Sequence, residues 1–331
     1  MMDFNRKIVA VPIGDPAGIG PEIVLRALKD RKIRNLMDIV VVGEAEVLRR
    51  HSEACGLNIE VKEASILVPS LPPVKLINVP VLENHDWKFG EISGATGKAC
   101  YEYACTGIKL ALEKKVSVVV AAPHTEASVN LAGLRFRGYP GLVAEKTGTP
   151  QESTFLMLLS PFYRVVNATL HLSLREAINL LDKKLILNAL KSTKQALDDL
   201  GLPDGSIGVC SLNPHAGEGG LMGSEEADFI EQGVYEARKL GINANGPFPS
   251  DSLFGDRRYD AYLALYHDQG HIPVKVASPR LASAITIGTP VLFGSVAHGS
   301  ALDIAGKGVA SEKAFIQALN NLVSYSDLEA L

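Results

Sequence analysis

Five of the eight histidines in this 331-residue chain stand directly after apolar runs of the kind that form buried strands. Neutral imidazole is a common ligand for zinc, manganese, cobalt, nickel and iron, and three imidazoles with an open coordination position form a catalytic metal site. Taken alone, each histidine is better explained as the cap of its own strand. Taken together, they indicate metal-assisted chemistry at one edge of a sheet. The five are His124, His171, His215, His267 and His271.

The segment YHDQGHIPVK, residues 266–275, concentrates polar side chains after the apolar run AYLAL. His267 and His271 have the i, i+4 spacing of a metal-binding pair on a helix. Gly270 and Pro273 argue against a helix that continues through the segment. We therefore expect no helix here and do not predict that the pair binds one metal ion together.

Lys275 closes the same segment. It is a candidate to bind a carboxylate, or to act as a general base if burial and a nearby cation lower its pKa. The alternative is an ordinary surface lysine. Asp251, in GPFPSDSLF, is a candidate to orient that lysine or to bind substrate. Asp268 and Gln269 are candidates to accept hydrogen bonds from metal-binding imidazoles.

Two glycine-rich loops lead into helical patterns. GDPAGIGPEI, residues 14–23, matches neither the P-loop nor the GxGxxG dinucleotide pattern. It is either a tight turn or a loop whose amides face an anionic substrate at a helix N-terminus, with Asp15 a candidate substrate contact. LNPHAGEGGLMGSEEADFI, residues 212–230, ends in a helix opened by Ser224, and its glycine content indicates a loop that lines a site.

The elements that position these groups alternate along the chain. Near-continuous apolar runs predict strands buried on both faces, and amphipathic stretches predict helices between them. Alternation of this kind indicates an α/β fold with a mostly parallel sheet, whose ligands gather beyond the carboxyl ends of the strands. Residues 154–172 instead predict a hairpin. The expected strands are 7–13, 38–44, 116–123, 206–212 and 260–266, and the expected helices are 21–30, 96–115, 174–184 and 224–240.

Composition narrows the classes of function. The length favours two domains over one core. A net charge of −4 without blocks of like charge argues against nucleic-acid and membrane partners and favours a small-molecule substrate. The four cysteines form no CxxC pair, which is typical of a reduced compartment. No apolar run is long enough for a membrane span or a secretion signal, so we expect a cytoplasmic protein.

Four motifs, in order along nearly the whole chain, resemble the 4-hydroxythreonine-4-phosphate dehydrogenase family: GDPAGIGPE, LNPHAGEGG, YHDQGHIPVK and HGSALDIAGKG. The resemblance implies a two-domain α/β fold similar to isocitrate and isopropylmalate dehydrogenases, with mostly parallel sheets and the active-site cleft between the domains. The first domain would comprise residues 1–130 and 296–331, with a nucleotide loop at 295–309. The second, 131–295, would carry the metal ligands and a dimer interface.

The same resemblance implies a nicotinamide cofactor, NAD or NADP, bound without a GxGxxG fingerprint. Its expected contacts lie in the nucleotide loop. It further implies one divalent metal ion per site, of zinc, manganese, cobalt, nickel or iron, held by His171, His215 and His267 and shared between the subunits of a homodimer. Lys275 takes the position of the family's substrate-contacting lysine. The expected cofactor contacts are His298, Gly299, Asp303 and Gly306.

Departures from the family pattern bear on the substrate. Tyr139 and Pro140 stand where phosphate-substrate members have histidine and threonine, and Ala284 and Phe293 stand where they have asparagine and arginine. Arginine matches phosphate oxygens with a planar fork, so its replacement by phenylalanine argues against a phosphorylated substrate. The pattern resembles instead a branch typified by terephthalate cis-dihydrodiol dehydrogenase. Tyr139 and Phe293 are then candidate contacts to a flat carbocycle.

The prediction is NAD-dependent and metal-dependent oxidation of a β-hydroxy carboxylate followed by decarboxylation, with a non-phosphorylated cis-dihydrodiol carboxylate as substrate. One alternative within the family is a dehydrogenase of 4-phosphohydroxy-threonine or a four-carbon sugar-acid phosphate. A second is a hydrolase that uses three histidines to activate a metal-bound water. A third is a protein that binds a metal or nucleotide without catalysis.

Overall fold

The computed structural model describes residues 7–57, 61–63, 74–82, 87–279 and 281–328. The chain divides into two compact units, Met1–Thr147 with Pro290–Ser324 and Gly148–Thr289 with Tyr325–Leu331. The sequence-based division placed the boundary after residue 130, before a helix that belongs to the first unit. The outermost ends of the predicted first domain, 1–6 and 329–331, lie outside the described residues.

In the first unit, the described residues form six parallel strands in the order β3-β4-β2-β1-β5-β12. Valine and isoleucine dominate the central strands, which are buried along almost their whole length. Such strands suit a parallel sheet that is covered on both faces. The bounds are β1 Ile8–Pro12, β2 Asp38–Gly43, β3 Val61–Glu63, β4 Val74–Asn78, β5 Val118–Ala121 and β12 Phe293–Val296.

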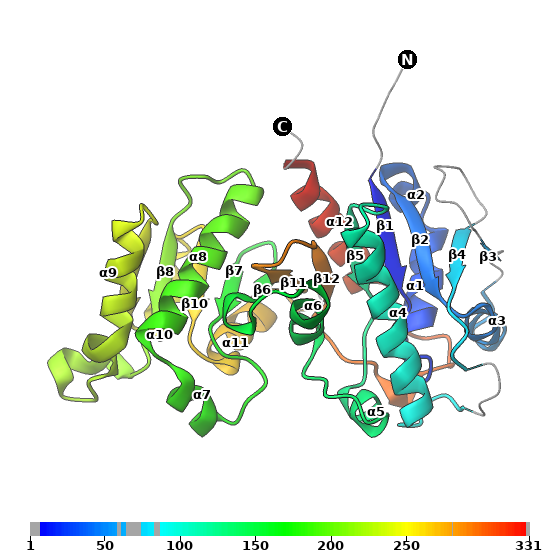
Figure 1. The fold of residues 1–331 in the computed structure, drawn as a ribbon, viewed down its shortest axis with the longest axis horizontal. Helices are drawn as coiled ribbons and strands as arrows, with labels where there is room; N and C mark the ends of the chain where they lie inside the picture. Colours follow the sequence, from blue (N-terminus) through cyan, green and yellow to red (C-terminus); the bar gives the residue numbers. More distant parts are fainter. Residues whose placement is uncertain (1–6, 58–60, 64–73, 83–86, 280, 329–331) are drawn as a thin grey trace, which may run out of the picture. The chain divides into compact units, whose positions relative to one another are not determined.

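Helices connect and cover these strands. Figure 1 shows the long helix α4 lying across the strands of the first unit, and α4 contacts β1, β2 and β5. The side chain of Ser93 caps α4 by accepting a hydrogen bond from the amide of Thr96. The helices are α1 Gly20–Lys29, α2 Arg31–Leu36, α3 Ala45–Ala54, α4 Gly94–Leu112, α5 Glu126–Leu131, α6 Tyr139–Thr147, η4 Leu302–Ile304 and α12 Lys313–Leu328.

The described part of the second unit also forms six strands, in the order β11-β6-β7-β10-β8-β9. β7, β10, β8 and β9 are parallel neighbours, whereas β6 pairs antiparallel with both β7 and β11. The hairpin predicted around Ser160 and Pro161 is confirmed as β6 and β7. The bounds are β6 Phe155–Leu159, β7 Arg164–Asn167, β8 Ile207–Cys210, β9 Ala244–Phe248, β10 Ala261–Ala264 and β11 Ser283–Ile287.

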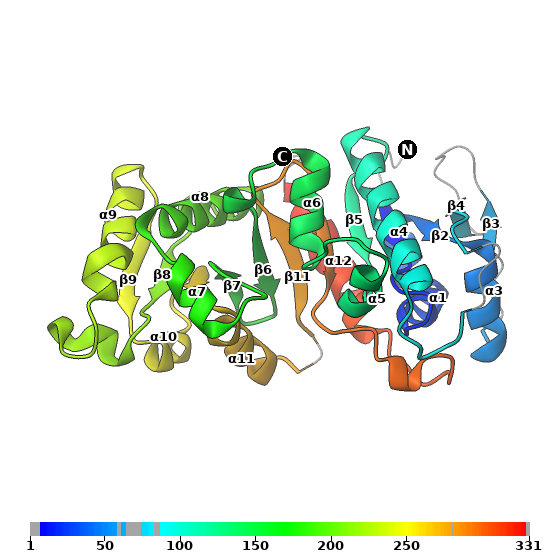
Figure 2. The same ribbon diagram turned by 60° about the horizontal axis from the view of Figure 1, so that its bottom comes forward.

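Figure 2 shows α8 and α11 on either side of the strands of the second unit. α8 contacts β7, β10 and β11, and α11 contacts β7 and β10. A capping box at Ser173 and Glu176 opens α7. The helices are η1 Gln151–Ser153, α7 Leu174–Leu180, α8 Lys183–Asp199, η2 Pro214–Gly220, the π-helix η3 Glu226–Ile230, α9 Glu231–Lys239, α10 Ser250–Asp256 and α11 His267–Ala277.

The expected α/β class with mostly parallel sheets is confirmed. The prediction that no helix continues through Gly270 and Pro273 was wrong, because α11 is continuous there. Proline at this position lacks the amide that would bond to the carbonyl of Gln269, and its ring crowds that carbonyl. Burial of Gly270, His271 and Val274 on α11 outweighs that loss. Among the described residues, no helix has the length and apolar character needed to cross a bilayer.

Gly270 allows α11 to lie close to the sheet. A Cβ at this position would be 2.3 Å from Oδ1 of the buried Asn167, 2.9 Å from Cγ1 of Val165 and 3.0 Å from Cβ of Ala264. Those distances are below normal carbon contacts, so a methyl group would push the helix away from β7 and β10.

We expect Gly270→Ala to lower the free energy of unfolding by about 2 kcal/mol relative to Gly255→Ala. Gly255 is also helical, but a Cβ there would meet nothing within 4 Å, so both variants share the gain in helix propensity. Urea denaturation of the two variants and the wild type measures the difference. Equal stability of the two variants would contradict the close packing of α11.

Candidate active site

Two of the predicted metal ligands meet at the carboxyl ends of neighbouring strands. His171 follows β7, and His267 is the first residue of α11 after β10. Because β7 and β10 are paired in parallel, their carboxyl ends point the same way. The ring centroids of the two histidines are 5.6 Å apart, with 42° between the ring planes. The sheet thus brings together two imidazoles that are 96 residues apart in the sequence.

A cavity of about 350 Å³ opens beside this pair. Its lining combines the two imidazoles and a carboxylate with an apolar wall from the segment after β7 and from α7. The lining residues are Leu170, His171, Leu172, Leu174, Ala177, Tyr266, His267 and Asp268. Polar groups that converge beside an apolar wall are typical of a small-molecule site.

Asp268 fixes the orientation of the His267 ring. Its Oδ1 lies 2.6 Å from Nδ1 of His267, so the carboxylate accepts a hydrogen bond from the Nδ1–H group. A neutral imidazole that carries its proton on Nδ1 keeps the lone pair of Nε2 for a ligand. The carboxylate–imidazole contact expected from the sequence is therefore present, in the form that metal-binding histidines commonly have.

His271 stacks on His267, with ring centroids 3.7 Å apart and 12° between the planes. Its Nδ1–H donates a hydrogen bond to the carbonyl of His267 at 3.0 Å. Burial, together with the neighbouring His267 and Lys275, lowers the pKa of His271 to about 3. The ring is therefore neutral near pH 7 and supports His267 as a flat, uncharged neighbour.

Gln269 was predicted to accept a hydrogen bond from a metal-binding imidazole, but its side chain bonds to other groups. Its side-chain oxygen accepts a hydrogen bond from the amide of Leu265 at 2.6 Å. Its side-chain nitrogen donates to the carbonyl of Ser211 at 2.7 Å and to the hydroxyl of Ser250 at 2.8 Å. Gln269 therefore joins the ends of β10 and β8 to the start of α10, rather than a ligand imidazole.

The third predicted ligand, His215, lies in a loop with unusual backbone geometry. The five residues 215–219 all have positive φ, including the non-glycine residues His215, Ala216 and Glu218. L-residues pay about 1–2 kcal/mol for a left-handed conformation, so such a run persists only where surrounding contacts enforce it.

Glu226 provides that enforcement. Its side chain is 4% exposed, and Oε1 accepts hydrogen bonds from the amides of Leu212 at 2.8 Å and Asn213 at 2.7 Å. Oε2 accepts from Nδ2 of Asn213 at 2.9 Å. Burial alone would raise the pKa of Glu226, but the hydrogen bonds from the amide and side chain of Asn213 outweigh it and lower the pKa below its usual value. An ionised Glu226 thus holds the start of the loop that presents His215.

These histidines fit a divalent metal in chemical type. Two imidazoles lie side by side, and one of them has its tautomer set by a carboxylate. Within the described residues of a single chain, no three histidine, cysteine, aspartate or glutamate side chains group closely enough to hold a metal ion. The pair His171 and His267 is therefore two-thirds of the predicted ligand set, and a complete set requires a further ligand.

The two predicted catalytic side chains lie on separate helices. Lys275 is exposed in the last turn of α11, and Asp251 is exposed in the first turn of α10. Asp251 accepts a hydrogen bond from the amide of Ser252 at 2.9 Å. In the part of the chain that the structure describes, no hydrogen bond or ion pair joins Lys275 to Asp251. Their participation in catalysis stays a prediction.

The first unit brings the loop after β1 together with the predicted nucleotide loop. The amide of Ile19 donates to the carbonyl of Ser300 at 2.9 Å. The hydroxyl of Thr125, which follows β5, donates to the hydroxyl of Ser300 at 2.8 Å. GDPAGIGPE and HGSALDIAGKG, nearly 300 residues apart in the sequence, therefore form one surface at the carboxyl ends of β1 and β5.

Asp15 is completely buried in this loop. Its Oδ1 accepts a hydrogen bond from the amide of Ala17 at 2.9 Å, and its Oδ2 has no hydrogen-bond partner among the described residues. Burial raises the pKa of Asp15, and the neighbouring Thr125 hydroxyl and Ala17 amide offset this only in part. The buried side chain of Asp15 therefore stabilises the loop 14–23 through its hydrogen bond from Ala17.

Tyr139 and Phe293 pack against each other in the first unit, with ring centroids 5.0 Å apart. Both are buried, Tyr139 at 3% and Phe293 at 1% exposure. The hydroxyl of Tyr139 donates to the carbonyl of Ala122 at 2.9 Å. His124, half-buried at the end of β5, lies edge-on to Tyr139 at 4.4 Å. The two predicted carbocycle contacts thus form an apolar layer beneath the end of β5.

The four predicted cofactor contacts follow β12. His298, Gly299 and Asp303 are exposed, and Nδ1–H of His298 donates to the carbonyl of Gly299 at 3.0 Å. Gly306 has φ +72°, and a Cβ there would lie 2.8 Å from the ring of Phe89. The loop therefore requires glycine at this point and presents its exposed polar groups to solvent.

Several residues that hold these loops are not marked by the sequence. Glu226 and Glu22 lie in the first turns of helices, where an acidic residue is expected to be exposed and to complement the helix dipole. Their spacing from a glycine-rich loop is the only sequence signal that distinguishes them from exposed carboxylates. His51 carries no signal at all, because its partner is the distant Pro16 carbonyl at 2.8 Å.

Two α/β units with mostly parallel sheets carry polar groups at their strand ends. A β-decarboxylating dehydrogenase from Thermococcus kodakarensis has a similar fold, with a TM-score of 0.52, 16% identity and coverage of 96% of this chain and 83% of that chain. The chain belongs to the family described as pyridoxal phosphate biosynthetic protein PdxA, which matches residues 35–322. The family resemblance of the four motifs is thereby confirmed.

The similar proteins include dehydrogenases named for dihydrodiols and dehydrogenases named for phosphorylated hydroxy acids. A 1,2-dihydroxy-3,5-cyclohexadiene-1,4-dicarboxylate dehydrogenase from Comamonas sp is 36% identical, with 96% of this chain and 98% of the relative covered. A solved terephthalate 1,2-cis-dihydrodiol dehydrogenase from Burkholderia xenovorans is 36% identical, covers 97% and 98%, and has a TM-score of 0.67. A solved 4-hydroxythreonine-4-phosphate dehydrogenase from Klebsiella pneumoniae is 32% identical, covers 97% and 99%, and has a TM-score of 0.87. The chain is accordingly an oxidoreductase that acts on CH–OH groups.

We expect Glu226→Gln to lower the free energy of unfolding by about 2 kcal/mol near pH 7, because the variant loses a charged acceptor and turns an amide nitrogen toward Nδ2 of Asn213. A carboxyl whose pKa is lowered by folding contributes stability above its unfolded pKa and loses it as the pH falls through the folded pKa. The difference from wild type should therefore shrink in acid. Urea denaturation of the variant and the wild type, near pH 7 and in acid, measures this difference in stability.

Glu231→Gln, an exposed change on α9, is the matched control and should leave stability unchanged. If Glu226→Gln unfolds like the wild type at neutral pH, the carboxylate does not hold the His215 loop.

Proposed function

We propose that the protein is an NAD-dependent and metal-dependent dehydrogenase of a non-phosphorylated β-hydroxy carboxylate, of the cis-dihydrodiol dicarboxylate type. The secondary alcohol would lose a hydride, which the nicotinamide accepts when bound, and a proton, which a base accepts. The resulting β-keto acid would lose its carboxylate as carbon dioxide, the electron pair of the broken C–C bond would enter the ring, and the former ketone oxygen would take up a proton as the ring becomes aromatic. NADP in place of NAD is compatible with the same chemistry.

The observation that carries this proposal is the surrounding of Phe293. Where phosphate-substrate members of the family have arginine, Phe293 is almost completely buried and packs on Tyr139. The hydroxyl of Tyr139 is engaged with the carbonyl of Ala122. A phosphate dianion needs a fixed cation or several free donors, and these two rings supply neither.

The cavity beside the histidine pair supports the same substrate class. Leu170, Leu172, Leu174 and Ala177 line it together with His171 and His267 and make part of its wall apolar. A flat hydrocarbon ring buries apolar surface against such a wall, at a gain of about 25 cal/mol per Å². The named activities of the two relatives at 36% identity, both acting on dihydrodiols of this kind, point in the same direction.

Different side chains of the protein would bind the metal ion, the substrate and the nucleotide. His171, His215 and His267 would hold a divalent metal ion, with Asp268 keeping the Nδ1 proton of His267 in place. The ion, when bound, would stabilise negative charge on the substrate's oxygens. Lys275 would bind a substrate carboxylate or remove the hydroxyl proton. The exposed loop of His298, Gly299 and Asp303 would bind the nucleotide, and a homodimer would complete the shared ligand set.

Substrate choice tests the proposal directly. We expect NADH formation from a cis-dihydrodiol dicarboxylate with kcat/KM at least about a hundredfold above that for 4-phosphohydroxy-threonine or a sugar-acid phosphate, because a missing phosphate site costs several charged hydrogen bonds. Absorbance at the NADH band measures both reactions under the same conditions. Turnover of the phosphorylated substrate alone would overturn the assignment, and hydrolysis without NAD reduction would favour a metal-dependent hydrolase.

Metal binding gives a second test. We expect His171→Ala, His215→Ala and His267→Ala each to lose the bound metal and more than about 99% of the activity, since one ligand of three is removed. Elemental analysis of the purified proteins measures the metal, and circular dichroism checks the fold. His298→Ala, an exposed change outside the ligand set, should keep its metal. Unchanged metal content in all three ligand variants would refute the site.

A further inference from the structure

Glu22, in the first turn of α1, is a buried carboxylate whose partners lie at opposite ends of the chain. It is completely buried, and its Oε1 accepts hydrogen bonds from Nε of Arg26 at 2.9 Å and from the amide of Ala310 at 3.0 Å. A carboxylate that only complements the helix dipole would be exposed. Burial of a charge is costly unless it is paired and hydrogen-bonded. The Glu22 carboxylate therefore depends on its hydrogen bond from Ala310, the residue that follows the nucleotide loop.

Arg26 binds the chain two residues before Ala310, at the end of the nucleotide loop itself. Its Nη2 donates to the carbonyl of Gly308, while its Nε is paired with Glu22. The guanidinium is planar and its donors are fixed relative to one another. The two side chains therefore bind one backbone acceptor and one backbone donor, two residues apart, and set both the position and the direction of the chain at 308–310.

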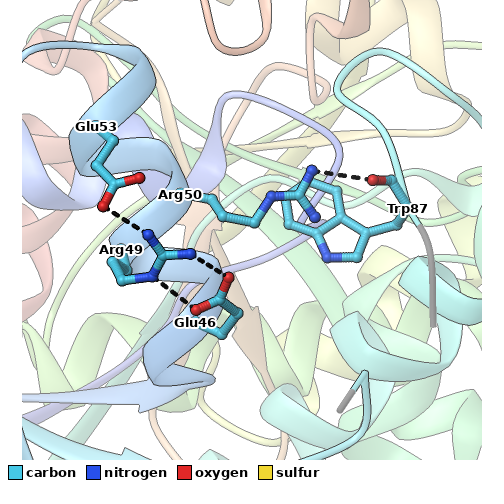
Figure 3. A network of polar contacts seen from close by, with 5 residues as sticks. All are labelled: Glu46, Arg49, Arg50, Glu53 and Trp87. Carbon is cyan, nitrogen blue, oxygen red and sulfur yellow. Dashed lines mark hydrogen bonds and ion pairs between the residues drawn. The ribbon is translucent and has the colours of Figure 1, made fainter. Parts of the chain in front are cut away.

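Other contacts hold the start and the middle of the loop, and Glu22 and Arg26 of α1 hold its end. Near its start, the carbonyl of Ser300 accepts from the amide of Ile19. In its middle, Gly306 lies against the ring of Phe89. Figure 3 shows the neighbouring contact in which Arg50 of α3 donates to the carbonyl of Trp87 at 3.1 Å and covers its ring.

We propose that Glu22 and Arg26 are positioning residues for nucleotide binding, which preorganise the loop 298–310 so that the exposed groups of His298, Gly299 and Asp303 meet the cofactor in one arrangement. The inference rests on the proposed function, in which this loop binds NAD. A loop that is fixed before binding loses less conformational entropy when it binds. Neither side chain touches the cofactor, and their effect acts through the backbone at Gly308 and Ala310.

Arg26→Gln tests the proposal with little risk to folding, because this side chain is 25% exposed. We expect the dissociation constant for NADH to rise about tenfold, since roughly one net charged hydrogen bond to the loop is lost. The kcat at saturating NAD and the KM for the acid substrate should stay near wild type. Arg26→Lys, which keeps the charge and one donor direction, should recover part of the affinity.

Arg49→Gln is the matched control. Figure 3 shows that Arg49 pairs with Glu46 and Glu53 on the exposed face of α3. This is also an arginine–carboxylate pairing within one helix, and among the described residues it includes no hydrogen bond to the nucleotide loop. This variant should bind NADH like the wild type. Hydrogen exchange at the amide of Ala310, measured without cofactor, should be faster in Arg26→Gln and in Glu22→Gln than in Arg49→Gln.

The possible results distinguish the positioning role of Glu22 and Arg26 from the proposed function. Wild-type NADH affinity in Arg26→Gln, or a parallel fall of kcat and of both substrate affinities with loss of thermal stability, would overturn the positioning role while leaving the proposed function intact. Failure of the wild-type protein to bind any nicotinamide dinucleotide would overturn the proposed function and the positioning role together.

Discussion

Parallel pairing of strands is the constraint on which the candidate sites depend. In the second unit, β7, β10 and β8 run in the same direction, so the segments that carry His171, His267 and His215 all begin at one edge of the sheet. In the first unit, β1 and β5 do the same for the glycine-rich loop and for Thr125. The backbone hydrogen bonds of the ladders thus determine which side chains can meet, before any side chain contributes to a site.

Buried carboxylates hold these loops in one conformation by accepting hydrogen bonds from their backbone amides. Glu226 accepts backbone hydrogen bonds at the start of the His215 loop, and Glu22 accepts one beyond the nucleotide loop. In both cases a charge takes up amide groups that would otherwise face the interior unpaired, which is costly. The left-handed run at 215–219 shows how much backbone strain such contacts sustain. Both sites therefore depend on acidic residues that need not touch a ligand.

The aromatic pair Tyr139 and Phe293 places two rings at family positions without any change in the sheet that carries them. Two polar positions of phosphate-substrate members are occupied here by rings that pack on each other and on the end of β5. The strands are unaffected, since Phe293 begins β12 as a regular, buried residue. The proposed difference in substrate therefore involves the side chains of one layer and leaves the supporting sheet unchanged.

The sequence by itself determined the class of fold, because buried strands and amphipathic helices leave periodic patterns that local physics dictates. It also determined the family and the identity of the histidines that follow β7, β8 and β10. Tertiary structure decided what depends on partners distant in the chain: the continuity of α11 through Pro273, the use of Gln269 to join strand ends, and the burial of Glu22 and Glu226. A carboxylate on a helix looks the same in sequence whether it faces water or a backbone amide 288 residues away, since only packing determines which partner it meets.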